Sequence, residues 1–144
     1  MLAGAALHQV LPRRLQQLQT PGERGALQDI VYGSLRQYGR GDFLLARLLA
    51  KPLDVPEVRA LLLVALYRLE TRPDAAHTVV DQAVAACGRL GHGRARGFVN
   101  AALRNYLRQR ETLERAATRN DVGRFGYPQW WVDRVRTAYP DAWQ

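Results

Sequence analysis

The stretch Gly97-Phe98-Val99-Asn100-Ala101-Ala102-Leu103-Arg104-Asn105-Tyr106-Leu107-Arg108 has the periodicity of a helix with two different faces. At about 100° per residue, its larger apolar side chains fall on one broad side. These residues are Phe98, Val99, Ala102, Leu103, Tyr106 and Leu107. Arg104 and Arg108 fall together on the opposite side, one turn apart. The pattern predicts a helix that packs one face into a core and carries cations on the other.

Two interpretations of this cationic face are open. Arg94, Glu111 and Arg115 extend it in both directions, so it contains a single acid among several cations. Like charges one turn apart destabilise an isolated helix by roughly 0.2–0.5 kcal/mol, which favours an external anion as partner. A solvated face with an Arg108–Glu111–Arg115 ladder is the alternative, and the stretch alone does not decide between them.

The composition is that of a basic single domain. The chain has 144 residues, a net charge of +8 and 47% hydrophobic residues, and Lys51 is its only lysine. Arginine suits bidentate contacts to phosphate, so the balance favours a polyanion: RNA, DNA or an anionic membrane. The codon usage of a GC-rich genome would also enrich arginine, and that explanation stays open.

Several classes of site lack support in the sequence. Cys87 is the only cysteine, which excludes an intrachain disulfide and a cysteine metal cluster. His8, His77 and His92 are widely separated and lack the spacing of metal ligands. The most apolar run, Ala60–Leu66, is far shorter than the ~20 residues of a membrane span. Without a recognisable targeting segment, we expect a soluble, cytoplasmic protein that binds no metal.

Proline and glycine punctuation without strand alternation predicts an all-α bundle of about six to seven helices. Pro56–Thr71 is apolar nearly all round and should be the central, most buried helix. Gly33 inside a helix is best explained by a neighbouring helix that packs close to it. The expected helices cover residues 2–19, 21–38, 43–50 (capped by Asp42), 56–71, 75–90, 97–117 and 129–139.

The glycine-rich segment 88–97 does not fit a nucleotide-binding loop. It lacks a Gly-Lys-Ser/Thr ending and follows a helix instead of a strand. It is either a basic connector that can meet a phosphate backbone or a plain surface turn. His77 and Asp81, one turn apart, have no nucleophile placed beside them, so we interpret them as a surface pair.

The composition changes after Arg119. Residues 120–128 are expected to form a linker, followed by a short helix that carries Trp130 and Trp131. Three tryptophans in the last fifteen residues favour an element that packs on something further along, and therefore a truncated chain from a longer protein. A tail folded back onto the bundle is the alternative.

Five segments follow one another along the chain: Val31–Arg36, Leu49–Leu53, Leu62–Leu69 with Tyr67, Ala76-His77 with Val80 and Ala83-Val84, and Phe98–Arg104. Their order and spacing resemble those of a NusB-type helical domain. They are similar to the N-terminal domain of the Sun/RsmB-type ribosomal RNA (cytosine-5) methyltransferases over residues 2–117. The tail Tyr127–Arg134, with Ala138-Tyr139-Pro140, is similar to the segment that leads those enzymes into their catalytic half.

The resemblance implies two small helical subdomains and RNA as the partner. In the whole enzymes a later Rossmann-like domain binds S-adenosylmethionine, one cysteine attacks the cytosine ring and a second helps to release the product. Here Cys87 lies in a helix of a different domain and no glycine-rich turn follows a strand. We therefore expect residues 1–119 to be a NusB-like RNA-binding domain, 120–144 to lead into an absent methyltransferase domain, and this chain to hold no catalytic residue.

The leading hypothesis is an RNA-engaging N-terminal domain that positions ribosomal RNA for the enzyme's own C-terminal methyltransferase domain. Asn100 is assigned a structural role, bonding the adjoining loop. The phosphate contacts are expected from Arg36, Arg40, Arg94, Arg96, Arg104 and Arg108, with Arg13 and Arg14 as weaker candidates. A free-standing antitermination factor of the NusB type, or a protein-interaction module whose arginines only solvate the surface, are the alternatives.

Overall fold

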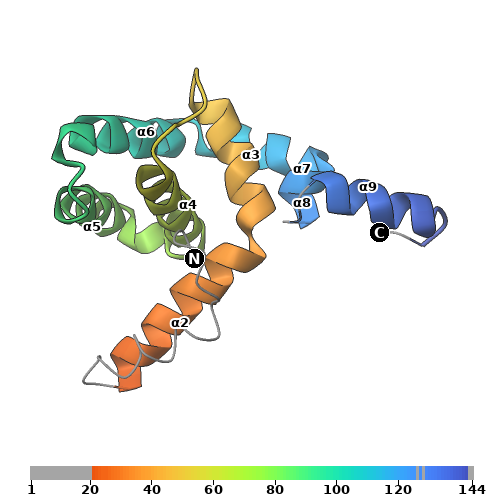
Figure 1. Ribbon diagram of the computed structural model, residues 1–144, viewed down its shortest axis with the longest axis horizontal. Coiled ribbons are helices and arrows are strands. Elements are labelled where there is room, and N and C mark those ends of the chain that lie inside the picture. Colours follow the sequence, from red (N-terminus) through yellow and green to blue (C-terminus); the bar gives the residue numbers. More distant parts are fainter. Residues whose placement is uncertain (1–20, 126, 128, 143–144) are drawn as a thin grey trace.

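The computed structural model describes residues 21–125, 127 and 129–142 (Figure 1). The helix predicted over residues 2–19, with Arg13 and Arg14, lies outside this part of the chain. The described residues contain no strand, so the all-α prediction is confirmed. The elements are α2 (Pro21–Arg36), α3 (Tyr38–Leu48), α4 (Pro56–Thr71), the 3₁₀ turn η1 (Pro73–Ala75), α5 (Ala76–Arg89), the 3₁₀ turn η2 (Gly93–Ala95), α6 (Arg96–Arg108), α7 (Arg110–Arg119), α8 (Asp121–Phe125) and α9 (Gln129–Ala138).

Helix α4 is the centre of the bundle, as its composition predicted. Pro56 occupies the first turn, where its missing N–H costs no hydrogen bond, and Pro73 follows soon after the last residue. The helix packs against α2, α3, α5 and α6. Its fully or nearly fully buried side chains are Val58, Leu62, Ala65, Leu66 and Leu69.

Helices α3 and α5–α8 form two groups beside α4. Helices α5 and α6 pack on each other and on α4, whereas α3 packs on α4 and in turn carries α7 and α8, which also pack on each other. Helix α6 buries Val99, Ala102, Leu103 and Tyr106, which confirms most of the apolar face predicted for this stretch. Phe98 is the exception, because 41% of it is exposed.

Helix α3 begins earlier than expected. A single non-helical residue, Gln37, separates it from α2, and the new helix starts at Tyr38. Asp42 therefore does not cap a helix, and its carboxylate instead accepts a hydrogen bond from Arg59 on α4. Gly33 on α2 confirms the close packing predicted for it, because a Cβ there would overlap the hydroxyl end of the Tyr67 side chain.

Two features of the C-terminal third differ from the sequence expectation. The helix expected over 97–117 is broken at Gln109, whose backbone angles are −105° and 12°, so α6 and α7 are separate elements. The expected linker over 120–128 contains α8, which packs against α3 and α7. Gly123 allows this approach, because a Cβ there would lie 2.6 Å from the Ala117 carbonyl oxygen.

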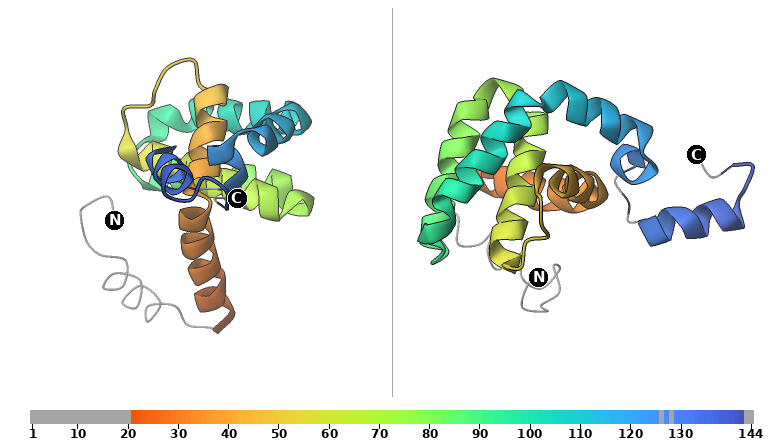
Figure 2. Two further views of the ribbon diagram at one scale, coloured as in Figure 1. Left: turned by 90° about the vertical axis from the view of Figure 1, so that its right-hand side faces the viewer. Right: turned by 90° about the horizontal axis from the view of Figure 1, so that it is seen from above.

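Helix α9 matches the helix predicted over 129–139 and projects beyond the bundle from the end that carries α8 (Figure 2). Within the described part of the chain, no helix is long and apolar enough to cross a bilayer. The same residues contain no cluster of three or more histidine, cysteine or acidic side chains that could hold a metal ion.

Candidate nucleic-acid interface

The first candidate site is a groove between the α3–α4 loop and one side of α6, which we call the loop groove. It encloses about 640 Å³. Among the described residues, its walls carry two cations, Lys51 and Arg108, and no carboxylate. The remaining lining is mostly apolar: Leu48, Leu49, Ala50, Pro52, Leu53, Phe98, Ala101, Ala102 and Asn105. The groove therefore combines positive charge with an apolar floor.

Phe98 gives this groove an accessible aromatic ring. The residue belongs to the first turn of α6 and is exposed although its neighbour Val99 is completely buried. The sequence pattern places Phe98 on the apolar face of its helix and includes Lys51 in a segment of the family resemblance, but it does not predict either residue as a site residue. The sequence offered two separate signals: a lysine directly before Pro52, just after a predicted helix, and an aromatic residue in the first turn of another helix.

The second candidate site lies at the other end of α3 and is named the α2–α3 groove. It encloses about 450 Å³. Arg36, exposed at the end of α2, is its most accessible predicted residue. The lining residues are Gly33, Arg36, Gln37, Arg40, Tyr67, Glu70, Thr71 and Arg124.

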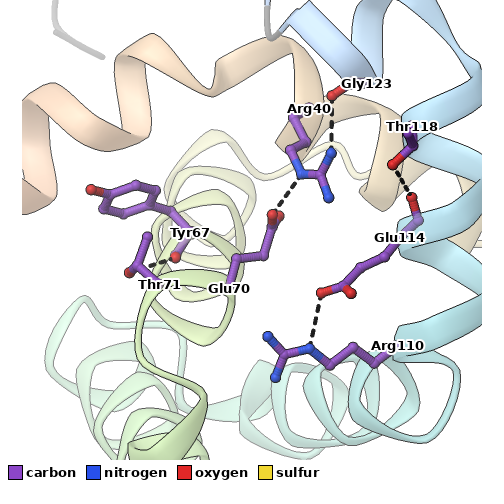
Figure 3. A network of polar contacts seen from close by, with 8 residues as sticks. All are labelled: Arg40, Tyr67, Glu70, Thr71, Arg110, Glu114, Thr118 and Gly123. Carbon is purple, nitrogen blue, oxygen red and sulfur yellow. Dashed lines mark hydrogen bonds and ion pairs between the residues drawn. The ribbon is translucent and has the colours of Figure 1, made fainter.

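Arg40 has protein partners in this groove, as Figure 3 shows. Its Nε donates to a carboxylate oxygen of Glu70 at 2.5 Å, and its Nη1 donates to the carbonyl of Gly123 at 3.2 Å. Each side chain of the Arg40–Glu70 pair is only 19% exposed. Arg40 therefore links α3, α4 and α8 through its Nε and Nη1 atoms, and the phosphate contact predicted for its guanidinium stays a prediction.

The surroundings of Glu70 form a partly buried polar network. Burial raises the pKa of Glu70 above its ordinary value, and the hydrogen bond and charge of Arg40 oppose this shift without cancelling it. Burial also raises the pKa of Tyr106, helped by the negative charge of Glu70. Across from them, Arg110 Nε donates to Glu114 at 3.0 Å.

The other predicted arginines lie on or beside α6. Arg104 Nε donates to Asn100 Oδ1 at 3.1 Å, so Asn100 orients an arginine instead of bonding the adjoining loop. Arg94 is exposed in η2, and the Arg96 guanidinium lies against Gly88 at the C-terminal end of α5, where the helix dipole favours a cation.

The predicted cations therefore fall into separate groups. Arg36 at the end of α2 and Arg40 near the start of α3 line the α2–α3 groove, and Arg108 lines the loop groove. Arg94 in η2 and Arg96 at the start of α6 lie at the α5–α6 connection. Part of the alternative ladder exists, because Glu111 pairs with Arg115 at 2.5 Å. The two grooves share no lining residue, so the predicted arginines do not all line one groove.

Residues that could suggest catalysis have structural or surface positions. Cys87 is buried, and its thiol donates to the His92 carbonyl at 3.1 Å. His77 and Asp81 lie 3.4 Å apart with both side chains largely exposed, as expected for a surface pair.

The helical bundle with these basic grooves defines a NusB-type domain. Comparison with known families matches residues 2–108 to the NusB family, and the chain belongs to that family. The resemblance drawn from the sequence is thus confirmed.

Its curated relatives carry the name Ribosomal RNA small subunit methyltransferase B. The chain is 38% identical over 143 residues to the protein of that name from Vibrio cholerae, covering 98% of this chain and 33% of that protein. It is 34% identical to those of Vibrio vulnificus, with the same coverage, and of Pseudomonas putida, with 97% and 32% covered. The chain spans about a third of the length of these relatives and corresponds to their N-terminal part.

Proposed function

We propose that this chain is the RNA-binding N-terminal domain of an S-adenosylmethionine-dependent ribosomal RNA cytosine-5 methyltransferase. It would hold ribosomal RNA in register while a following catalytic domain binds S-adenosylmethionine and selects the cytosine. Family membership, the name of the curated relatives and a net charge of +8 support this function. A cytoplasmic location follows from the proposed substrate.

The loop groove is the observation that carries the proposal. Lys51 and Arg108 can neutralise phosphates, while the exposed ring of Phe98 offers a stacking surface to an unpaired base. Stacking on aromatic side chains is typical of proteins that bind single-stranded or looped RNA. No carboxylate belongs to the described residues that line this groove, so they would not repel a phosphate backbone.

The other accessible arginines extend this interface. Arg104 lies on the same helix as Phe98 and Arg108, and Arg94 and Arg96 precede that helix or begin it. Arg36 would contact a more distant part of the RNA through the α2–α3 groove. Phosphate contacts of this kind fix position and orientation without reading sequence, which leaves base selection to the catalytic domain.

A salt series tests the proposal. Affinity for a fluorescent single-stranded fragment of small-subunit ribosomal RNA should fall as salt rises. Lys51→Ala and Arg108→Ala should each weaken binding and reduce the slope of log affinity against log salt by about 0.7 for each phosphate that is no longer neutralised. Phe98→Ala should cost about 1–3 kcal/mol of binding without changing that slope.

Arg115→Ala is the matched control for these variants. It removes the same charge from an exposed arginine that already pairs with Glu111 outside the loop groove, so it should change affinity little. A flat salt dependence, or equal losses for Arg108→Ala and Arg115→Ala, contradicts RNA binding in this groove.

The apolar lining of the loop groove favours one alternative, a docking site for a protein segment. In that function the arginines would only solvate the surface, as in an interaction module or an antitermination factor that works with a ribosomal protein. A partner that is retained after nuclease treatment and lost on Phe98→Ala would support this alternative over RNA binding.

A further inference from the structure

Exposed aromatic side chains gather at the C-terminal end of the described chain. Trp130 is 63% exposed and Tyr139 64% exposed, and Tyr127 and Trp131 are also accessible. The rings of Tyr127 and Trp131 contact each other with centroids 4.3 Å apart and planes inclined by 32°. Such a concentration of large apolar surface on one short segment is typical of an interaction site.

The two sides of α9 have different environments. Val132 is almost completely buried, so one side of the helix packs against the bundle. Trp130 precedes it by two residues and therefore lies about 160° away around the helix axis. Arg134, one turn further on, lies over the Trp130 ring at 6.0 Å from its centroid. The face that carries Trp130 is thus directed away from the bundle against which Val132 packs.

The charge of this segment discriminates between possible partners. Residues 127–142 contain two arginines, Arg134 and Arg136, and two aspartates, Asp133 and Asp141, so their net charge is zero in a chain of net charge +8. Arg136 is in addition paired with Asp121 on α8. A neutral, aromatic surface gives a polyanion little electrostatic attraction, whereas aromatic side chains with few net charges are characteristic of protein interface cores.

We propose that the aromatic face formed by Trp130 and Trp131 of α9, together with the Tyr127 ring that contacts Trp131, is the docking surface for the catalytic portion of the same polypeptide. This inference rests on the proposed function. About two-thirds of each named relative lies outside the region matched by this chain, which corresponds to their N-terminal part. In a protein of that length, the segment that follows α9 leads directly into the catalytic portion, which would cover this face.

Hydrogen exchange in the full-length gene product tests the docking surface. Peptides covering residues 127–142 should exchange at least about tenfold more slowly in the full-length protein than in the 144-residue chain. Trp130→Ala in the full-length protein should remove that protection, because truncation of a central aromatic anchor typically costs more than a factor of about ten in affinity. Leu90→Ala, at a residue 51% exposed at the end of α5, is the matched control and should leave the protection unchanged.

Three results would overturn the docking proposal. Equal exchange in the two proteins shows an uncovered face. Protection that rises with concentration of the 144-residue chain assigns the face to a second copy. Loss of RNA affinity on Trp130→Ala in the 144-residue chain assigns it to nucleic acid. Failure of the loop-groove variants to affect RNA binding, with docking intact, would refute the proposed function and leave this surface in place.

Discussion

Arg40 on α3 and Glu70 on α4 form a partly buried ion pair whose arginine also holds the backbone of α8. The pair joins Nε to a carboxylate oxygen at 2.5 Å, and the second guanidinium bond runs to the Gly123 carbonyl. A side chain that bridges three helices explains why Asp121–Phe125 is a packed helix although its composition is that of a linker. Arg40 thereby contributes to the shape of the α2–α3 groove without offering a free cation to it.

Glu70→Gln should change how stability depends on pH. Burial raises the pKa of Glu70 above 4.5, with Arg40 and Arg110 acting against the shift and Glu114 adding to it. The folded state therefore binds the proton more tightly than the unfolded state, and this contribution to stability is lost as pH rises through the folded pKa. Urea unfolding should show wild type gaining stability relative to Glu70→Gln as pH falls towards 4.5. If wild type instead loses stability relative to Glu70→Gln as pH falls, the Arg40 charge dominates over burial.

Tyr106→Phe should be neutral or stabilising by up to about 1 kcal/mol. The Tyr106 hydroxyl is buried and has no hydrogen-bond partner among the described residues, so its removal relieves an unmet desolvation cost. Tyr106→Ala should cost about 3–5 kcal/mol, because it empties a completely buried site in the core. Chemical denaturation of both variants checks the pair, and a large loss in the phenylalanine variant would reveal a bond to the hydroxyl.

Gly33→Ala and Gly25→Ala should differ although both positions lie in α2. Alanine raises helix stability by roughly 0.5–1 kcal/mol relative to glycine at an open position, and a Cβ at Gly25 meets nothing within 4 Å. At Gly33 the new methyl group displaces the Tyr67 ring, which should cancel or reverse the gain. Thermal unfolding of the two variants provides the comparison. Equal gains would show that Tyr67 moves aside freely.

Gly123→Ala should destabilise the protein by about 1–3 kcal/mol. Its Cβ would lie 2.6 Å from a backbone oxygen of α7, which cannot rotate away as a side chain could. Hydrogen exchange should be faster in residues 121–125, while peptides from α4 keep their protection. Unchanged exchange in α8 would mean that α7 yields to the added methyl group.

The sequence was sufficient for the elements that local signals define. Pro56 and Pro73 bracket α4, and the uniform apolarity between them predicts a central helix. It was insufficient at Gln109, where no proline or glycine marks the break between α6 and α7. The helix α8 was missed for a related reason: its packing depends on Gly123 fitting against α7 and on a distant arginine, neither of which a local pattern contains.

The candidate site was predictable in residue type and unpredictable in grouping. Helical periodicity correctly put Arg104 and Arg108 away from the core. It could not show that Arg108 would share a groove with Lys51 and Phe98, because that depends on where the α3–α4 loop crosses α6. Nor could it show that Arg40 would form an ion pair with Glu70, a residue thirty positions away.

Helix α3 acts as a spacer between the two basic grooves. Arg40, near its start, lines the α2–α3 groove, and Leu48, its last residue, lines the loop groove, so these two lining positions lie about 12 Å apart along the axis. A polynucleotide that reaches both ends would gain from bivalent attachment, whereas an oligomer too short for that span would occupy one end at a time. The length of one rigid helix thus sets a minimum footprint, and affinity measured against oligomer length should rise in a step where that span is first bridged.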